Sequence, residues 1–294
     1  MLLTAAAISV LFFTKSSGHE HSVIKVIDGQ PSLAMKVLGQ IGEPRGFQIT
    51  HTKDGAVFTK DQLAKYDLFV FYTSGDLTEL GRQTDPPMPA GGKEALLAAI
   101  EGGKGFVGIH AAADTFHTTE ERFVADGDKT DPYLKMLGGE FIRHGPQQVA
   151  RLQCSDAKFP GMAAQCAPLD LHEEWYSYKN LATDLHVIQW LETWSLKNTA
   201  GGSVYRRPPY PVTWVRRHGK GRIFYTALGH REDVWERPSF QEMLAGGLLW
   251  AARRIDTDAT PNISTVTPGY AELPPNDPTP TPVARPTPAP TPGS

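Results

Sequence analysis

Short apolar runs without polar alternation recur along the first part of the chain, at residues 8–14, 68–73 and 105–109. Such runs are typical of strands that are covered on both faces, since neither face carries the polar residues of a solvated surface. Candidate helices lie between them at residues 31–41, 60–65 and 92–101. The second begins at Thr59-Lys-Asp-Gln62, which has capping-box spacing. This alternation predicts an α/β fold in which a mostly parallel sheet has helices on both faces.

The later part of the chain predicts a hairpin and a closing helix. Residues 212–215 and 222–227 flank the basic turn Arg216-Arg-His-Gly-Lys-Gly221, and residues 240–254 follow a helical pattern. Pro and Thr dominate residues 274–294, which cannot bury enough apolar surface to offset their ordering entropy. We therefore expect one domain at 8–256 and a disordered tail at 257–294, whose use as a stalk or linker is left open.

Charge and hydropathy exclude some classes of protein. A net charge of −3 and a pI of about 6.4 argue against nucleic acid as a partner, because proteins that bind nucleic acid usually carry a basic face. The uncharged run at residues 1–13 is shorter than the roughly 20 residues of a membrane span, and no Lys or Arg precedes it. We interpret it as leading into a first strand and not as a signal peptide. The compartment, cytoplasmic or exported, is left open.

The chain has two cysteines, Cys154 and Cys166, in neither a CxxC pattern nor a disulfide-rich framework. They could be paired or free. Because a domain of this size can be stabilised by its core alone, we expect free thiols.

Histidines follow several of the predicted strands. Ligands of an open parallel sheet bind beyond the carboxyl ends of its strands, where the loops diverge. Five of the ten histidines lie in such segments: His19, His21, His110, His117 and His230. Imidazole suits both proton transfer near neutral pH and metal ligation, so these segments predict the functional site. A single histidine in such a place is more commonly a structural residue, and the prediction depends on several converging.

His110 lies in the segment Gly103-Lys-Gly-Phe-Val-Gly-Ile-His110-Ala-Ala-Ala-Asp114. This segment predicts a strand followed by a tight turn into a helix. A turn of this kind projects one side chain into the crevice. Ser or Cys at that position would indicate covalent acyl chemistry, and neither is present. The small residues could instead serve only close packing of helix and strand.

Several blocks of the sequence together resemble the ThuA-like (trehalose utilisation) family. The blocks are Val10-Leu-Phe-Phe-Thr-Lys-Ser-Ser-Gly-His-Glu-His21, Gly105-Phe-Val-Gly-Ile-His110 with Asp114, Leu137-Gly-Gly-Glu-Phe-Ile-Arg-His144, Glu173-Glu-Trp-Tyr176, Pro211-Val-Thr-Trp-Val215, Gly219-Lys-Gly-Arg-Ile-Phe-Tyr-Thr-Ala-Leu-Gly-His230 and Gly247-Leu-Leu-Trp-Ala251. They occur in order over residues 8–254.

The resemblance implies a flavodoxin-like fold related to class I glutamine amidotransferases. In that relation His110 takes the place of the nucleophilic cysteine, and His230-Arg-Glu232 resembles the His-x-Glu pair. Without a thiolate the glutamine-hydrolysing mechanism has no nucleophile, so amidotransferase activity is not expected. The family's association with trehalose implies a small-molecule sugar substrate.

We assign site roles as hypotheses. The expected catalytic residues are His110, Glu174 and His230, with Glu174 and His230 as the acid–base pair. The expected substrate-binding residues are His21, Asp114, His144, Tyr176 and Glu232. Glu232 could also hold the tautomer of His230. Trp175, Tyr176 and Tyr178 could stack on a sugar ring or pack in the core.

A divalent metal such as zinc is a further hypothesis. His110, His144, Glu174 and His230 offer suitable nitrogen and oxygen ligands, but no compact spacing such as HExxH supports them.

The leading functional hypothesis is an enzyme that hydrolyses or isomerises a sugar or keto-sugar. The alternative is a non-catalytic carbohydrate-binding module. A nucleotide-binding loop is disfavoured because the glycines at 102–108 lie before and within a strand. Whether the chain forms a homo-oligomer is left open.

Overall fold

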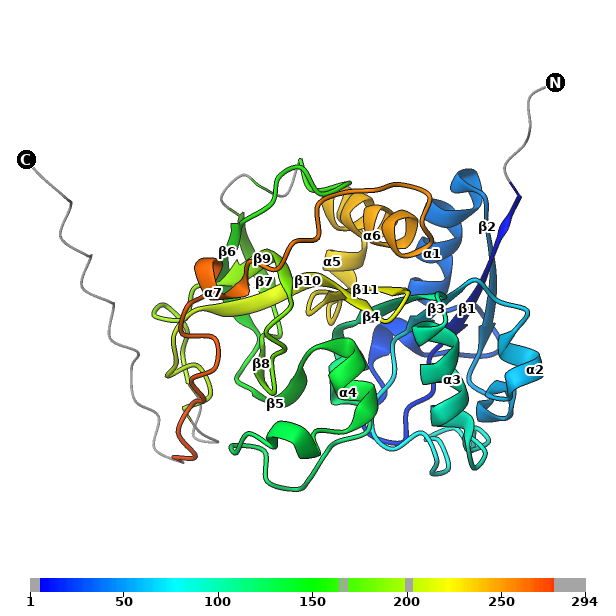
Figure 1. Ribbon diagram of the computed structural model, residues 1–294, viewed down its shortest axis with the longest axis horizontal. Helices are drawn as coiled ribbons and strands as arrows, with labels where there is room; N and C mark the ends of the chain where they lie inside the picture. The colour runs from blue at the N-terminus through cyan, green and yellow to red at the C-terminus, as the bar shows by residue number, and fades with distance from the viewer. Residues whose placement is uncertain (1–5, 164–165, 167–168, 199–202, 278–294) are drawn as a thin grey trace, which may run out of the picture.

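A nine-stranded sheet forms the centre of the computed structural model, which describes residues 6–163, 166, 169–198 and 203–277 (Figure 1). Its strand order is β2-β1-β3-β4-β11-β10-β9-β6-β7. Parallel pairing joins β2 (Phe47–Thr52), β1 (Ile8–Phe13), β3 (Leu68–Phe71), β4 (Gly105–Ile109) and β11 (Gly221–Thr226). Antiparallel pairing adds β10 (Tyr210–His218), β9 (His186–Leu191), β6 (Gln148–Cys154) and β7 (Leu169–Glu173).

Helices cover both faces of this sheet, as Figure 1 shows. One face carries α1 (Leu33–Gly42), α5 (Glu232–Trp235) and α6 (Pro238–Ala251), and the other carries α2 (Lys60–Leu63), α3 (Gly92–Glu101) and α4 (Pro132–Leu137). The Thr59 side chain accepts a hydrogen bond from the backbone N–H of Gln62, so the predicted N-terminal cap of α2 is present. The α/β, flavodoxin-like fold expected from the sequence is confirmed.

The expected strands at β1, β3 and β4, the helices α1, α2, α3 and α6, and the hairpin of β10 and β11 are all present. All residues of β3 and β4 are buried, which explains their unbroken apolar sequences. β2 and the strands from β5 to β9 were not expected from the sequence. At the two edges of the main sheet, β2 and β7 mix buried with partly exposed residues, so their sequences lack the apolar signature.

A separate two-stranded sheet carries part of the candidate site. It pairs β5 (Glu140–His144) with β8 (Tyr176–Lys179) in antiparallel fashion, and Tyr176 lies opposite His144. The chain enters β8 directly after β7, so the turn at Glu174 links the two sheets.

The domain boundary expected at residue 256 is too early. In the segment beyond it, Ile263 in α7 (Ile263–Val266) is 1% exposed. The Asn262 side chain accepts from the backbone N–H of Val187 at 2.6 Å, and the Tyr270 carbonyl accepts from Arg207 at 2.8 Å. Residues 257–277 therefore pack on the domain, because they bring their own apolar anchor and backbone partners. The Pro/Thr-rich residues 278–294 lie outside the described residues.

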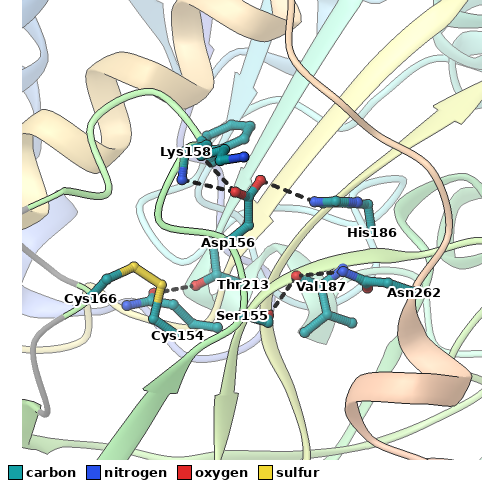
Figure 2. Close-up of a disulfide and its surroundings, with 11 residues drawn as sticks. Cys154, Ser155, Asp156, Lys158, Cys166, His186, Val187, Thr213 and Asn262 are labelled. Carbon is teal, nitrogen blue, oxygen red and sulfur yellow. Dashed lines mark hydrogen bonds and ion pairs between the residues drawn. A yellow bond between two sulfur atoms is a disulfide. The ribbon is translucent and has the colours of Figure 1, made fainter.

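The expectation of free thiols is also wrong, since Cys154 and Cys166 form a disulfide (Figure 2). Cys154 ends β6, and the two cysteines are 12 residues apart in the sequence. Between them, the Asp156 carboxylate contacts His186 Nε2 at 3.1 Å and accepts from the backbone N–H of Lys158 at 2.9 Å. Their spacing alone could not reveal that this loop brings the cysteines together.

Within the described residues, no helix combines the length and apolar character required to cross a lipid bilayer.

Opening the disulfide should destabilise the domain. Because the crosslink closes a short loop, the double substitution Cys154→Ser with Cys166→Ser should lower the free energy of unfolding by about 3 kcal/mol. Urea denaturation measures this, and dithiothreitol should produce the same loss in the wild type but none in the variant. Equal stability of the two proteins would contradict the crosslink.

Candidate active site

Four side chains converge at the carboxyl edge of the parallel strands: His21, His110, Glu174 and His230. Their ligand atoms all lie within 4.8 Å of one another. They follow β1, β4, β7 and β11, so segments far apart in the sequence supply one site. We call this set the His/Glu cluster. The structure thus brings together all three residues expected to be catalytic, together with His21.

His110 is held in a strained backbone position at the end of β4. Its φ is +43°, in the left-handed region that non-glycine residues rarely adopt. Tyr225 Oη donates to its carbonyl at 2.8 Å. Its Nδ1 donates to the Ala227 carbonyl at 2.7 Å, which fixes the tautomer of the neutral ring. Nε2 is the ring nitrogen that faces Glu174 Oε2, 3.4 Å away.

A close approach of two loops positions His21. The backbone N–H groups of Ser17 and Gly18 donate to the Ser74 carbonyl, and the Ser74 hydroxyl donates to the His19 carbonyl at 2.6 Å. Gly75 has a φ of +75°, and a Cβ there would lie 2.4 Å from the Gly18 nitrogen. Glycine at 75 is thus required both by the backbone conformation and by the contact.

The loop after β11 is fixed from two sides. The Gly229 N–H donates to Glu173 Oε2 at 2.9 Å, and Tyr72 Oη donates to the Gly229 carbonyl at 3.0 Å. The next residue, His230, directs Nδ1 at Glu174 Oε2, 3.1 Å away. Its Nε2 lies 2.8 Å from the side-chain nitrogen of Gln147.

Glu174 is the electrostatic centre of the cluster. Burial alone would raise the pKa of this carboxyl, but His110, His230 and His144 outweigh that effect and hold it well below its usual range. The carboxylate is therefore charged although the residue is only 7% exposed.

The imidazoles experience opposite effects. Burial and the neighbouring His110 and His230 lower the pKa of His21 well below its usual value. Burial also opposes protonation of His230, but contact with Glu174 outweighs it and raises the pKa of that ring. The cluster thus holds a neutral imidazole, His21, beside a readily protonated one, His230, with ring centroids 5.0 Å apart.

The expected substrate-binding residues occupy different places. His144 contacts Glu174 Oε1 at 3.3 Å from the rim, where its side chain is 41% exposed. Asp114 pairs with His117 Nε2 at 2.6 Å, outside the cluster. Glu232 accepts a hydrogen bond from Ser22. His230 has Gln147 and Glu174 as its ring partners, so the expectation that Glu232 holds its tautomer is not met.

The aromatic residues of this segment are buried. Tyr176 is 2% exposed, and its ring centroid lies 4.1 Å from that of His110 and 4.0 Å from that of Phe141. Trp175 and Tyr178 are fully buried. Of the two alternatives, core packing describes Trp175 and Tyr178, and Tyr176 forms a wall of the cluster. Contact between Tyr176 and a substrate hydroxyl stays a prediction, as it does for Asp114.

The expected set of metal ligands differs from the observed cluster at one residue. His21 replaces His144, which is not part of the four-residue set. His144 ends β5, a strand that was not expected from the sequence, so its distance from the other three ligands could not be anticipated.

Two supporting residues were missed. Gln147 contacts His230. The Glu173 carboxylate accepts hydrogen bonds from two backbone N–H groups, that of Gly229 and, at Oε1, that of Glu174 at 2.9 Å. Glu173 could have been suspected from its place beside Glu174, whereas no motif marks Gln147.

Comparison with known proteins identifies the family of this chain. A sequence model of the ThuA family, described as trehalose utilisation, matches residues 9–251. The chain belongs to the ThuA family. This membership supports a role in carbohydrate metabolism. A comparison with curated proteins gives no significant match.

Solved structures show the same fold. A protein described as ThuA-like from Bacteroides uniformis has 18% identity and a TM-score of 0.60, over 85% of this chain and 94% of that one. A second such protein, from Parabacteroides merdae, has 18% identity and a TM-score of 0.57, over 86% and 92%. A cytoplasmic protein from Salmonella typhimurium has 12% identity and a TM-score of 0.52, over 82% and 98%.

A matched pair of glycine substitutions tests the loop approach at the site. Gly46 and Gly75 both have positive φ, but a Cβ at Gly46 meets nothing within 4 Å. Gly46→Ala should cost about 1 kcal/mol of stability from backbone strain. Gly75→Ala should cost about 3 kcal/mol, because it also pushes the Gly18 loop away. Urea denaturation compares the two, and equal losses would refute the requirement for close contact.

A second buried carboxylate, Glu140, should make stability depend on pH. Burial opposes its charge, but hydrogen bonds from His117 and Thr118 and the charge of Lys179 lower its pKa to about 2. Since the unfolded value is about 4.3, this group should contribute about 3 kcal/mol above that pH and lose it as the pH falls toward 2.

Unfolding in urea at a series of pH values should show this loss, and Glu140→Gln should be less stable at pH 7 with a flatter acid limb. Asp170→Asn removes an exposed ion pair with Arg151 and should change little. An acid limb that is unchanged in Glu140→Gln would contradict the assignment.

Proposed function

We propose that this chain is an enzyme that acts on a sugar or keto-sugar, by hydrolysis or isomerisation, at the His/Glu cluster. One observation carries the proposal: a buried, charged Glu174 carboxylate lies 3.1 Å from His230 Nδ1 and 3.4 Å from His110 Nε2. A carboxylate and an imidazole at this separation can serve a single substrate as a pair of proton-transfer groups. Family membership supports a carbohydrate as that substrate.

The nature of the side chains favours catalysis over binding alone. A carbohydrate-binding module needs exposed aromatic faces and hydroxyl-accepting groups, whereas Trp175 and Tyr178 are buried here. The cluster instead gathers three imidazoles around one carboxylate, at a cost in desolvation and in backbone strain at His110. Such costs are typical of sites where proton transfer requires exact placement.

The proposed chemistry follows from the groups present. The carbonyl of a keto-sugar acidifies the C–H bond of the neighbouring carbon, so Glu174 can remove that proton as a base. The protonated His230 ring can then give a proton to the carbonyl oxygen, which yields the enediol of an isomerisation, or to a departing glycosidic oxygen, which leaves a C=C bond whose addition of water completes hydrolysis. His110 Nε2, with its fixed lone pair, can accept a substrate hydroxyl.

Activity should be sought with a panel of disaccharides and their keto derivatives, with mass detection of the products. A reaction whose kcat/KM has a bell-shaped pH profile would support the proposal. Binding of a sugar without conversion anywhere in the panel would favour a carbohydrate-binding module instead.

Glu174→Gln and His230→Ala should each lower kcat/KM by about 10²-fold to 10⁴-fold while the fold survives, because each removes a proton-transfer group. Circular dichroism checks the fold. Two matched controls should keep full activity. Glu242→Gln changes a residue of α6 that forms an exposed ion pair with Arg45, and His218→Gln changes the last residue of β10. Full activity in Glu174→Gln or His230→Ala would remove that residue from the mechanism.

A further inference from the structure

We propose that His21, His110, Glu174 and His230 together bind one divalent transition-metal ion, for which Zn²⁺ is the natural probe. Binding of the ion does not depend on the proposed function. Its part in turnover does rest on that function, because it would act in the same cluster.

The first argument is the set of ring nitrogens without a hydrogen bond. His21 Nδ1, His110 Nε2 and His230 Nδ1 are buried and none of them makes a hydrogen bond of normal geometry, although the last two lie 3.4 and 3.1 Å from Glu174 Oε2. The residues His110 and His21 are 0% and 3% exposed, so solvent is largely excluded from both rings. A buried polar atom left without a partner costs about 1–3 kcal/mol, and three in one place call for a shared partner. A metal ion accepts lone pairs from all three at once.

The second argument is the way in which His110 is held. Metal-binding histidines usually donate their other ring N–H to a carbonyl or carboxylate, which orients the ring and fixes the tautomer. His110 Nδ1 donates in this way to the Ala227 carbonyl at 2.7 Å, so its Nε2 is already in the form that a metal requires.

The third argument is charge. Among the described residues, the ionisable side chains that contact the Glu174 carboxylate are those of His110, His144 and His230. Metal-binding imidazoles are neutral, so the four ligands carry one net negative charge in a buried place. A divalent cation reverses this balance where no lysine or arginine makes such a contact.

The ligand types select the class of ion. Three imidazole nitrogens and one carboxylate oxygen suit zinc and its neighbours in the first transition row, whereas magnesium prefers six oxygens. Bonds of about 2.1 Å in a tetrahedral site separate ligands by about 3.4 Å. Glu174 Oε2 already lies 3.4 Å from His110 Nε2 and 3.1 Å from His230 Nδ1, while the widest separation within the set is up to 4.8 Å. Small side-chain movements would complete the site.

Binding of the ion requires a different orientation of the Gln147 side-chain amide. With the ion at His230 Nδ1, the proton of that ring lies on Nε2, which now faces the side-chain nitrogen of Gln147 at 2.8 Å. The Gln147 amide must therefore turn so that its oxygen accepts this proton, and it gives up the hydrogen bond that this oxygen accepts from Arg231 at 2.8 Å. With an ion bound, Glu174 and His230 would serve as ligands, and the ion would supply the means to lower the pKa of a water molecule in place of their acid–base roles.

The full chain, stripped with a chelator and dialysed, should be titrated with Zn²⁺ by calorimetry without any sugar. We expect one ion per chain and no comparable binding of Mg²⁺. Glu174→Gln and His21→Gln should each weaken Zn²⁺ binding at least tenfold. His230→Ala gives a third test at a less buried position, should either of these variants fail to fold. His218→Gln controls for the loss of any histidine and should bind as the wild type does.

Absence of stoichiometric Zn²⁺ binding to the wild type would overturn the proposal. Unchanged affinity in the folded cluster variants would also overturn it, because the ion would then lie elsewhere. Neither result bears on the sugar panel. Conversely, a chain that binds Zn²⁺ at the cluster but converts no sugar would keep the metal site and lose the proposed function.

Discussion

The contact between the Glu174 carboxylate and its surrounding imidazoles is the interaction on which the candidate site depends. A charge in this position is tolerated only because His110, His144 and His230 lie within 3.4 Å of it. Each partner is in turn fixed by the scaffold: His110 by the Ala227 carbonyl and Tyr225, and His230 by the loop that Glu173 and Tyr72 hold. Hydrogen bonds to the backbone around His110 and His230 therefore hold the site in place.

Much of the fold could be predicted from the sequence where physical constraints leave a local trace. Strands buried on both faces must be apolar throughout, so β3 and β4 were visible, and the cap at Thr59 marked the start of α2. Among the strands from β5 to β9, β5 and β8 form the small sheet and β7 lies at an edge of the main sheet, and the pairing of all five depends on distant partners. The disulfide was missed for the same reason, since loop closure between Cys154 and Cys166 is a property of the folded chain.

The site was partly predictable on similar grounds. The carboxyl-end rule for parallel sheets located His21, His110 and His230 without coordinates. The rule does not cover His144, because that residue ends β5 of the small sheet and follows no strand expected from the sequence. It also could not find Gln147, which follows no strand-exit pattern and matters only through its contact with His230. Residues that act through a neighbour leave no signature of their own in one sequence.

The segment at 257–277 affects how the protein can be handled. Ile263 is buried, Asn262 satisfies both backbone groups of Val187 on β9, and Arg207, itself buried, needs the Tyr270 carbonyl. An expression clone cut at the end of α6 would uncover an apolar surface beside β9 and leave a buried guanidinium short of an acceptor. Aggregation of such a clone would result from the loss of residues 257–277 and not from an unstable sheet. Shortened versions for crystallisation should therefore retain the chain through residue 277.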